Sequence, residues 1–295
     1  MPAATLNKRQ LIAMTVATAV LSTSSQAVVM TSNTVTSKDG TRIAFDRAGE
    51  GTALILVGGA LSDRSGSAPL AKVLSPHFTV LSYDRRGRGG SGDTARYAVE
   101  REIEDIEALI DAAGGTAFVH GQSSGAVLAL EATAKRPGKV QKLSLYEPPF
   151  IVDASRPLPP KNYVTRINDL IAAGRRDDAV AFFLTDVVGT PAEAVTKMRG
   201  IPAWPALVGL AHTLPYDIAV LGDGMSGAPL PANKWASVTV PALIMDGGAS
   251  PTWIRTSAQA LAEVLPHAKR HTLEGQAHNV APEVLGPELE RFFLD

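Results

Sequence analysis

The stretch VHGQSSGAV, residues 119–127, contains Gly121-Gln122-Ser123-Ser124-Gly125, a G-x-S-x-G sequence. An apolar run typical of a strand precedes it, and a helix-like run follows it. Two glycines let the chain turn sharply between strand and helix, which leaves the serine on a strained elbow with its hydroxyl exposed at a helix N-terminus. The motif alone has little specificity. Its strand-turn-helix context indicates that Ser123 is a candidate nucleophile rather than part of an ordinary glycine-rich turn.

Short apolar runs lie on both sides of this elbow, and several are rich in Val, Ile and Leu, as strands covered on both faces are. They are TALILVGG (52–59), FTVLSYD (78–84), AFVHG (117–121), KLSLYEP (142–148), PALIMDGG (241–248) and KRHTLEG (269–275). A hairpin precedes them, with Asp39-Gly40 in its turn. Amphipathic stretches such as EREIEDIEALIDAAGG (100–115) separate the runs. Strand and helix therefore alternate, which predicts a mostly parallel sheet.

The alternation stops between about Pro148 and Val238, a proline-rich region in which helical patterns follow one another with no strand between them. We therefore predict a helical cap over residues 148–238, inserted into a core made of residues 28–147 and 239–295. Its large aromatic side chains are candidates to line an acyl pocket, although we expect most of them to form the core of the cap. These are Tyr163, Phe182, Phe183, Trp204 and Trp235.

Further segments complete a pattern around the elbow. SYDRRGRGGSG (82–92) follows the fourth strand, the cap follows the sixth, and GQAHNV (275–280) lies near the C-terminus. From about Asn33 to Asp295 the chain thus resembles the α/β-hydrolase superfamily. The resemblance implies an α/β-hydrolase fold, with a mostly parallel eight-stranded sheet flanked by helices and a helical cap. It also implies that Ser123 is the nucleophile and that His278 is its base.

The position of His278 supports the same role independently. It lies between the strand-like KRHTLEG and the helix-like PEVLGPELERFF (282–293), on a loop at the sheet edge where the elbow also lies. For the other histidines, packing or solvation is the better interpretation. His120 is expected to pack at the strand end, and turns, cap or strand account for His77, His212, His267 and His271.

The catalytic acid, which must hold the histidine in the correct tautomer, is displaced or missing. In PALIMDGGASP (241–251), Ser250 stands where many serine hydrolases have Asp. Glu147 is the favoured candidate, because it ends the strand after the elbow helix, where some superfamily members, among them haloalkane dehalogenases and zearalenone lactonases, keep their acid. Asp246 is the alternative, although an Asp there can simply cap the following turn. The third possibility is that no functional acid exists.

An oxyanion hole needs two backbone N–H donors directed at the developing negative charge. The residue after the nucleophile, Ser124, is one candidate. The superfamily's usual His-Gly-x after the third strand is here Gly58-Gly59-Ala60, which makes the Ala60 amide the second. Losing the usual His removes no donor, because the contact is made by the backbone. The glycines also permit close packing.

Composition narrows the class of ligand. The 295 residues carry a formal net charge of −1 and no cysteine, so we predict no nucleic-acid partner, no disulfide framework and no thiolate site. DRRGRGGSGD (84–93) places three arginines among glycines, but it lacks the G-x-x-x-x-G-K-[ST] phosphate motif and is interpreted as a structural loop. Asp84 and Asp93 are too scattered for a metal site, so no metal and no cofactor are predicted.

The N-terminus has the order of a secretory signal peptide. Lys8 and Arg9 precede an apolar run at 11–21, which is shorter than the roughly 20 residues that span a bilayer, and Ser25 and Ala27 fit a cleavage site. We predict a signal peptide at 1–27 and an exported, periplasmic or secreted protein with no membrane segment after cleavage. A frayed N-terminal helix is the alternative. NKRQLI also resembles a weakened twin-arginine signal.

The predicted function is hydrolysis of a carboxylic ester or lactone of a small molecule through an acyl-enzyme, with a Ser-His-acid triad. A serine at the elbow argues against dehalogenase and epoxide-hydrolase chemistry, which in this superfamily uses a carboxylate nucleophile. A cofactor-free perhydrolase and a non-catalytic ligand-binding member of the fold are the alternatives. No pattern in the sequence indicates the oligomeric state.

Overall fold

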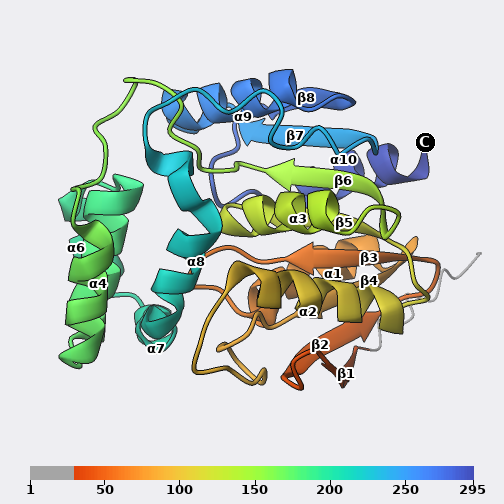
Figure 1. Cartoon of the computed structure of the whole chain (residues 1–295), viewed down its shortest axis with the longest axis horizontal. Helices are drawn as coiled ribbons and strands as arrows, with labels where there is room; N and C mark the ends of the chain where they lie inside the picture. Colours follow the sequence, from red (N-terminus) through yellow and green to blue (C-terminus); the bar gives the residue numbers. More distant parts are fainter. Residues whose placement is uncertain (1–29) are drawn as a thin grey trace, which may run out of the picture.

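Eight strands form one sheet in the computed structural model, which describes residues 30–295 (Figure 1). The strands are β1 (Thr31–Thr36), β2 (Arg42–Ala48), β3 (Thr52–Val57), β4 (Phe78–Tyr83), β5 (Ala117–Gln122), β6 (Val140–Tyr146), β7 (Ala242–Gly247) and β8 (Ala268–Leu273). Their order across the sheet is β1-β2-β4-β3-β5-β6-β7-β8. β2 pairs antiparallel with β1 and β4, and every other pairing is parallel. The predicted mostly parallel eight-stranded sheet is therefore confirmed.

Helices cover both faces of the sheet. Those of the core are α1 (Ala68–Leu74), α2 (Val99–Ala112), α3 (Ser124–Lys135), α9 (Thr252–Val264) and α10 (Pro282–Leu294). In β3, Leu54 and Leu56 pack in the cluster formed with α1 and α10, whereas Ile55 and Val57 pack in the cluster formed with α2, α3 and α9. Successive side chains of a strand point to opposite faces, so a strand covered on both faces is apolar throughout.

The segment between β6 and β7 is helical and lies beside the carboxyl ends of the parallel strands (Figure 1). Its elements are α4 (Tyr163–Ala172), α5 (Arg176–Phe182), η2 (Phe183–Val188), α6 (Ala192–Met198), α7 (Trp204–Gly209), η3 (Ala211–Thr213), α8 (Leu214–Leu221) and η4 (Gly222–Met225). We keep the name cap for residues 148–238. The exact limits of core and cap stay predictions.

The aromatic side chains of the cap serve packing. Phe182, Phe183, Trp204 and Trp235 are all buried in the hydrophobic core, and Tyr163 packs against it half-buried. Trp235 also contacts Phe150, with ring centroids 5.6 Å apart. Packing in the hydrophobic core therefore accounts for the burial of most of these residues.

The predicted signal peptide, 1–27, lies outside the described residues. None of the helices within residues 30–295 has both the length and the apolar character needed to cross a bilayer.

Candidate active site

Ser123 lies at the junction of β5 and α3 with φ 58° and ψ −129°, a backbone conformation that is costly for any residue other than glycine. The neighbouring chain makes this turn possible only with glycine on either side. A Cβ on Gly121 would lie 2.4 Å from the carbonyl oxygen of Gly125, and one on Gly125 would lie 2.3 Å from that of Val57. The G-x-S-x-G sequence thus forms the strained elbow that it predicts.

Glu147 and His278 are joined by a hydrogen bond. Glu147 follows β6 with φ 50°, its side chain is fully buried, and its Oε2 lies 2.6 Å from Nδ1 of His278. The other carboxylate oxygen, Oε1, accepts from the Ser250 hydroxyl at 2.5 Å and from the Gly247 amide at 2.9 Å. An ionised carboxylate only accepts hydrogen bonds, so Nδ1 carries a proton and Nε2 is left free to accept one.

The charge of Glu147 is stabilised by these same contacts. Burial by itself raises the pKa of a carboxyl group, but the hydrogen bonds from His278, Ser250 and Gly247 outweigh it, and the pKa of Glu147 lies below its usual value. The group is therefore ionised at neutral pH, as a residue that stabilises a histidinium must be.

Asp246, the alternative acid, faces another partner. It is fully buried at the end of β7, where both of its oxygens accept from Arg270, at 2.8 and 3.0 Å, and one also accepts from Thr272. Its hydrogen bonds within the described chain go to these two residues of β8 and not to His278. The structure thus brings Glu147, and not Asp246, to the histidine.

The His278 loop is attached to the elbow by a residue that the sequence analysis did not single out. Gln122, directly before Ser123, donates from Nε2 to the backbone oxygen of His278 at 2.7 Å. The histidine side chain remains about half exposed, at 48%. Gln122 occupies the variable position of the motif, so only its adjacency to Ser123 could have indicated a role.

The loop after β3 lies directly against Ser123. A Cβ on Gly59 would come within 2.9 Å of the Ser123 Cβ and 3.5 Å of its Oγ, so only glycine allows this approach. Ala60 follows it. Within residues 30–295, neither the Ala60 nor the Ser124 amide donates to a protein acceptor. Both are therefore free to bind an oxygen at the elbow, as an oxyanion hole requires. We call residues 58–62 the oxyanion loop, after the role predicted for Ala60.

The arginines of DRRGRGGSGD are structural. Arg85, Arg86 and Arg88 are each at most 2% exposed, and each pairs with a buried carboxylate. Arg85 binds Glu102 through two nitrogens, and Arg86 binds Asp105 in the same way. Buried guanidinium groups held by carboxylates are not available to a phosphate, which confirms the structural interpretation.

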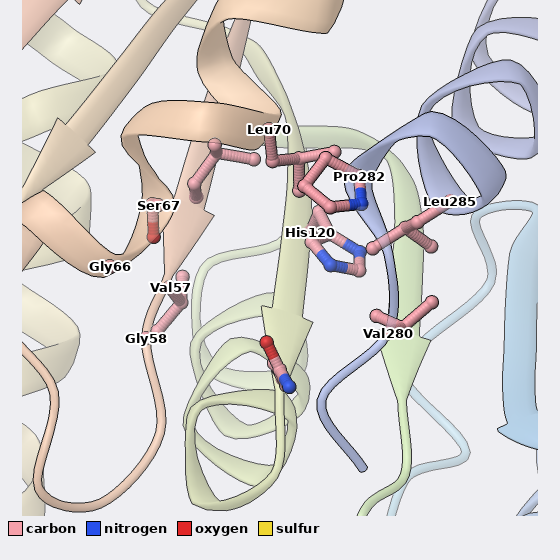
Figure 2. A pocket seen from close by; sticks show the side chains of 11 residues that line it. Val57, Gly58, Gly66, Ser67, Leu70, His120, Val280, Pro282 and Leu285 are labelled. Carbon is pink, nitrogen blue, oxygen red and sulfur yellow. The ribbon is translucent and has the colours of Figure 1, made fainter. Parts of the chain in front are cut away.

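His120 is packed in β5, as predicted. Its ring lines a small cavity of about 70 Å³ together with Leu70, Val280 and Leu285 (Figure 2). Nδ1 lies 3.2 Å from the Ser144 hydroxyl, and burial lowers the pKa of His120 to about 4. This histidine is therefore neutral at physiological pH.

Comparison with known proteins shows a family and a common fold. A model of the alpha/beta hydrolase family matches residues 54–285. The solved structure of an alpha/beta hydrolase from Sphaerobacter thermophilus is 56% identical, with a TM-score of 0.84, over 88% of this chain and all of that one. The enol-lactonase of Burkholderia xenovorans superposes with a TM-score of 0.67 at 20% identity, over 89% of this chain and all of that one, which shows a common fold alone.

Curated relatives match over shorter segments. N-formylmaleamate deformylase of Pseudomonas putida is 34% identical over 142 residues, which are 46% of this chain and 53% of the relative. An uncharacterised hydrolase of Bacillus subtilis is 32% identical over 113 residues, 37% of this chain and 42% of the relative. The chain thus spans about half the length of the curated relatives it matches.

Proposed function

Because the chain belongs to the alpha/beta hydrolase family, we propose that it hydrolyses a carboxylic ester or lactone of a small molecule through an acyl-enzyme on Ser123. The observation that carries this proposal is the 2.6 Å contact between Glu147 and Nδ1 of His278 beside the strained serine elbow. A buried, ionised acid, a histidine with a free Nε2 and a partly exposed nucleophile are the parts that acyl transfer needs.

The reaction begins when Nε2 of His278 takes the proton of Ser123 as its Oγ attacks the substrate carbonyl carbon. Glu147 stabilises the imidazolium that forms, and the amides of Ala60 and Ser124 bind the oxyanion. Collapse of the tetrahedral intermediate expels the alcohol, which receives the proton from His278. Water then attacks the acyl-enzyme with the same histidine as base and releases the carboxylic acid.

The test is a substrate panel with covalent labelling. Purified protein is assayed on p-nitrophenyl esters of increasing acyl length, on several lactones and on an N-formyl amide, since one relative is named as a deformylase. Stoichiometric labelling by a fluorophosphonate is measured in parallel. Ser123→Ala should abolish hydrolysis and labelling while the fold is kept, and Ser155→Ala, an exposed serine of the cap, serves as the control.

Other outcomes would replace this proposal. Peracid formation from a carboxylic acid and hydrogen peroxide, without ester turnover, would favour the perhydrolase alternative. Tight binding of a small ester with neither turnover nor labelling would favour a ligand-binding protein. Labelling that persists in Ser123→Ala would place the nucleophile elsewhere.

We also propose that residues 1–27 direct export and are then removed, because a basic pair, a short apolar run and small residues follow one another in signal-peptide order. N-terminal sequencing of the exported protein should begin near Val28. An intact Met1 in the soluble cytoplasmic fraction would refute this.

A further inference from the structure

We propose that Asp217, in the cap helix α8, is a positioning residue for the oxyanion hole: it holds Arg88, which in turn fixes the orientation of the Gly59–Ala60 peptide. The inference rests on the proposed function, in which the Ala60 amide binds the oxyanion. It gives the cap a part in catalysis that does not depend on contact with substrate.

Asp217 is 1% exposed and binds three groups of the core. Its Oδ2 accepts from Arg88 at 2.7 Å, and its Oδ1 accepts from Arg85 at 2.6 Å and from the Ser124 hydroxyl at 2.8 Å. Burial raises the pKa of a carboxyl group, but the charges of Arg88 and Arg85 outweigh it and hold the pKa of Asp217 below its usual value. The carboxylate therefore stays ionised in the interior.

Arg88 connects Asp217 to the oxyanion loop. Its Nη1 donates to the backbone oxygens of Gly59 at 2.6 Å and Ser62 at 3.1 Å. The Gly59 oxygen also accepts from the Ser62 hydroxyl at 2.8 Å. Two donors thus hold the carbonyl of one peptide that lies against the nucleophile.

The geometry of the peptide group transmits this constraint. In a planar trans peptide, the C=O of one residue and the N–H of the next point in opposite directions. With the Gly59 oxygen fixed towards Arg88 and Ser62, the Ala60 N–H must point the other way. Rotation of this peptide would remove the donor and present an oxygen in its place, which would repel an oxyanion.

Asp217 is the residue on which this arrangement depends most. Among residues 30–295 it is the one carboxylate paired with Arg88, whereas Arg85 is also bound by Glu102. Loss of the Asp217 charge would leave Arg88 buried with no counter-ion, and a guanidinium in that position turns towards water or another acceptor. Since Ser124 is bound as well, Asp217 links helix α8 to both sides of the oxyanion hole.

The first test is Asp217→Asn, compared with Asp105→Asn. Asp105 is an equally buried partner of a neighbouring arginine, Arg86, but that pair does not contact the oxyanion loop. Both variants should be less stable than wild type. Removing one oxyanion donor costs roughly 10²–10³ in kcat. We expect Asp217→Asn to lower kcat by at least about tenfold with little change in KM, and Asp105→Asn to keep the wild-type kcat once folded.

The second measurement is the affinity for phenylboronic acid, whose tetrahedral adduct with Ser123 places an oxygen at the oxyanion hole. Asp217→Asn should weaken it by about the factor lost in kcat. Ser62→Ala removes the other donor to the Gly59 oxygen without breaking an ion pair, so it tests the same peptide if Asp217→Asn does not fold. It should lower kcat several-fold with unchanged KM.

The outcomes separate the two proposals. If wild type is labelled and active while Asp217→Asn or Ser62→Ala keeps full kcat and boronate affinity, Asp217 only neutralises the arginines, and this inference is wrong although the hydrolase proposal stands. If wild type is neither labelled nor active, the hydrolase proposal fails and this one falls with it.

Discussion

Ser250 donates a hydrogen bond to Glu147 across the ends of two neighbouring strands, Oγ to Oε1 at 2.5 Å. The residue that takes the usual place of the acid thus donates to the carboxylate that we propose as the acid. The positive φ of Glu147 takes it out of regular strand geometry. Asp246 keeps that geometry and points to Arg270 on β8 instead.

Glu147→Gln should therefore reduce kcat strongly. Removal of a triad acid with the geometry kept costs on the order of 10⁴ in turnover, because the histidine loses its tautomer and the stabilisation of its charged form. The measurement is kcat on the best ester of the panel, with circular dichroism and thermal unfolding to establish that the variant is folded. An effect below about tenfold would leave a Ser-His pair as the catalytic unit.

Asp246→Asn is the matched control, and its expected effect is on stability. It removes the charge that Arg270 pairs with at the end of β7, where Asp246 is fully buried and Arg270 is 28% exposed. Breaking a fully buried pair costs about 3–5 kcal/mol, and the partial exposure of Arg270 should make the loss smaller. Urea denaturation should show a lower midpoint, while kcat stays near wild type. If kcat falls further than in Glu147→Gln, the acid belongs to the seventh strand.

Ser250→Ala should have a smaller effect on the same carboxylate. A hydrogen bond to a charged group contributes about 1.5–3 kcal/mol, so its loss raises the pKa of Glu147 and weakens its support of the histidinium. We expect a loss of about tenfold in kcat with KM unchanged. Ser250→Thr, which keeps the hydroxyl, should recover most of it. Equal activity of all three proteins would show that Glu147 is held well enough by Gly247 and His278.

The elbow, the sheet and the family were predictable because each leaves a local pattern. A G-x-S-x-G motif between a strand and a helix indicates a turn too tight for side chains on either side of the serine. The structure shows this steric requirement at Gly121 and Gly125. Glu147 could be proposed from its place at a strand end. Whether Glu147 or Asp246 contacts His278 depends on the direction of the two side chains and on the pairing of Asp246 with Arg270. Neither feature can be recognised from the spacing of residues in the sequence.

The supporting residues were beyond sequence reasoning for a different reason. Asp217 lies 93 positions from Ser124 and in a helix of the cap, so only the packing of cap on core brings it to Ser124 and to Arg88. From the sequence alone, an Asp that is buried in a helix cannot be distinguished from one that is exposed. The three arginines were the one indication of a buried carboxylate, since buried guanidinium groups require carboxylate partners. Their burial, however, is known only from the structure.

His120 should make the stability of the folded protein depend on pH. Its pKa is about 4 in the folded protein, where burial disfavours the charged ring, and about 6.5 in an unfolded chain. Between these values the unfolded state binds more protons, so the free energy of unfolding falls as pH is lowered from about 6.5 to about 4. At about 1.4 kcal/mol per pKa unit, the loss attributable to this ring reaches about 3 kcal/mol.

Urea denaturation of wild type and His120→Gln between pH 4 and 7.5 measures this contribution. The variant should be less stable at pH 7.5, because it disturbs the buried contact with Ser144, but should lose less stability on acidification. Glu147, whose pKa is lowered in the folded state, has the same sign but acts below its ordinary value of 4.5 and is present in both proteins, so the difference between their curves isolates the histidine. Parallel curves for the two proteins would contradict this. They would mean that the cavity beside His120 solvates the charged ring well enough to hold its pKa near that of the unfolded chain.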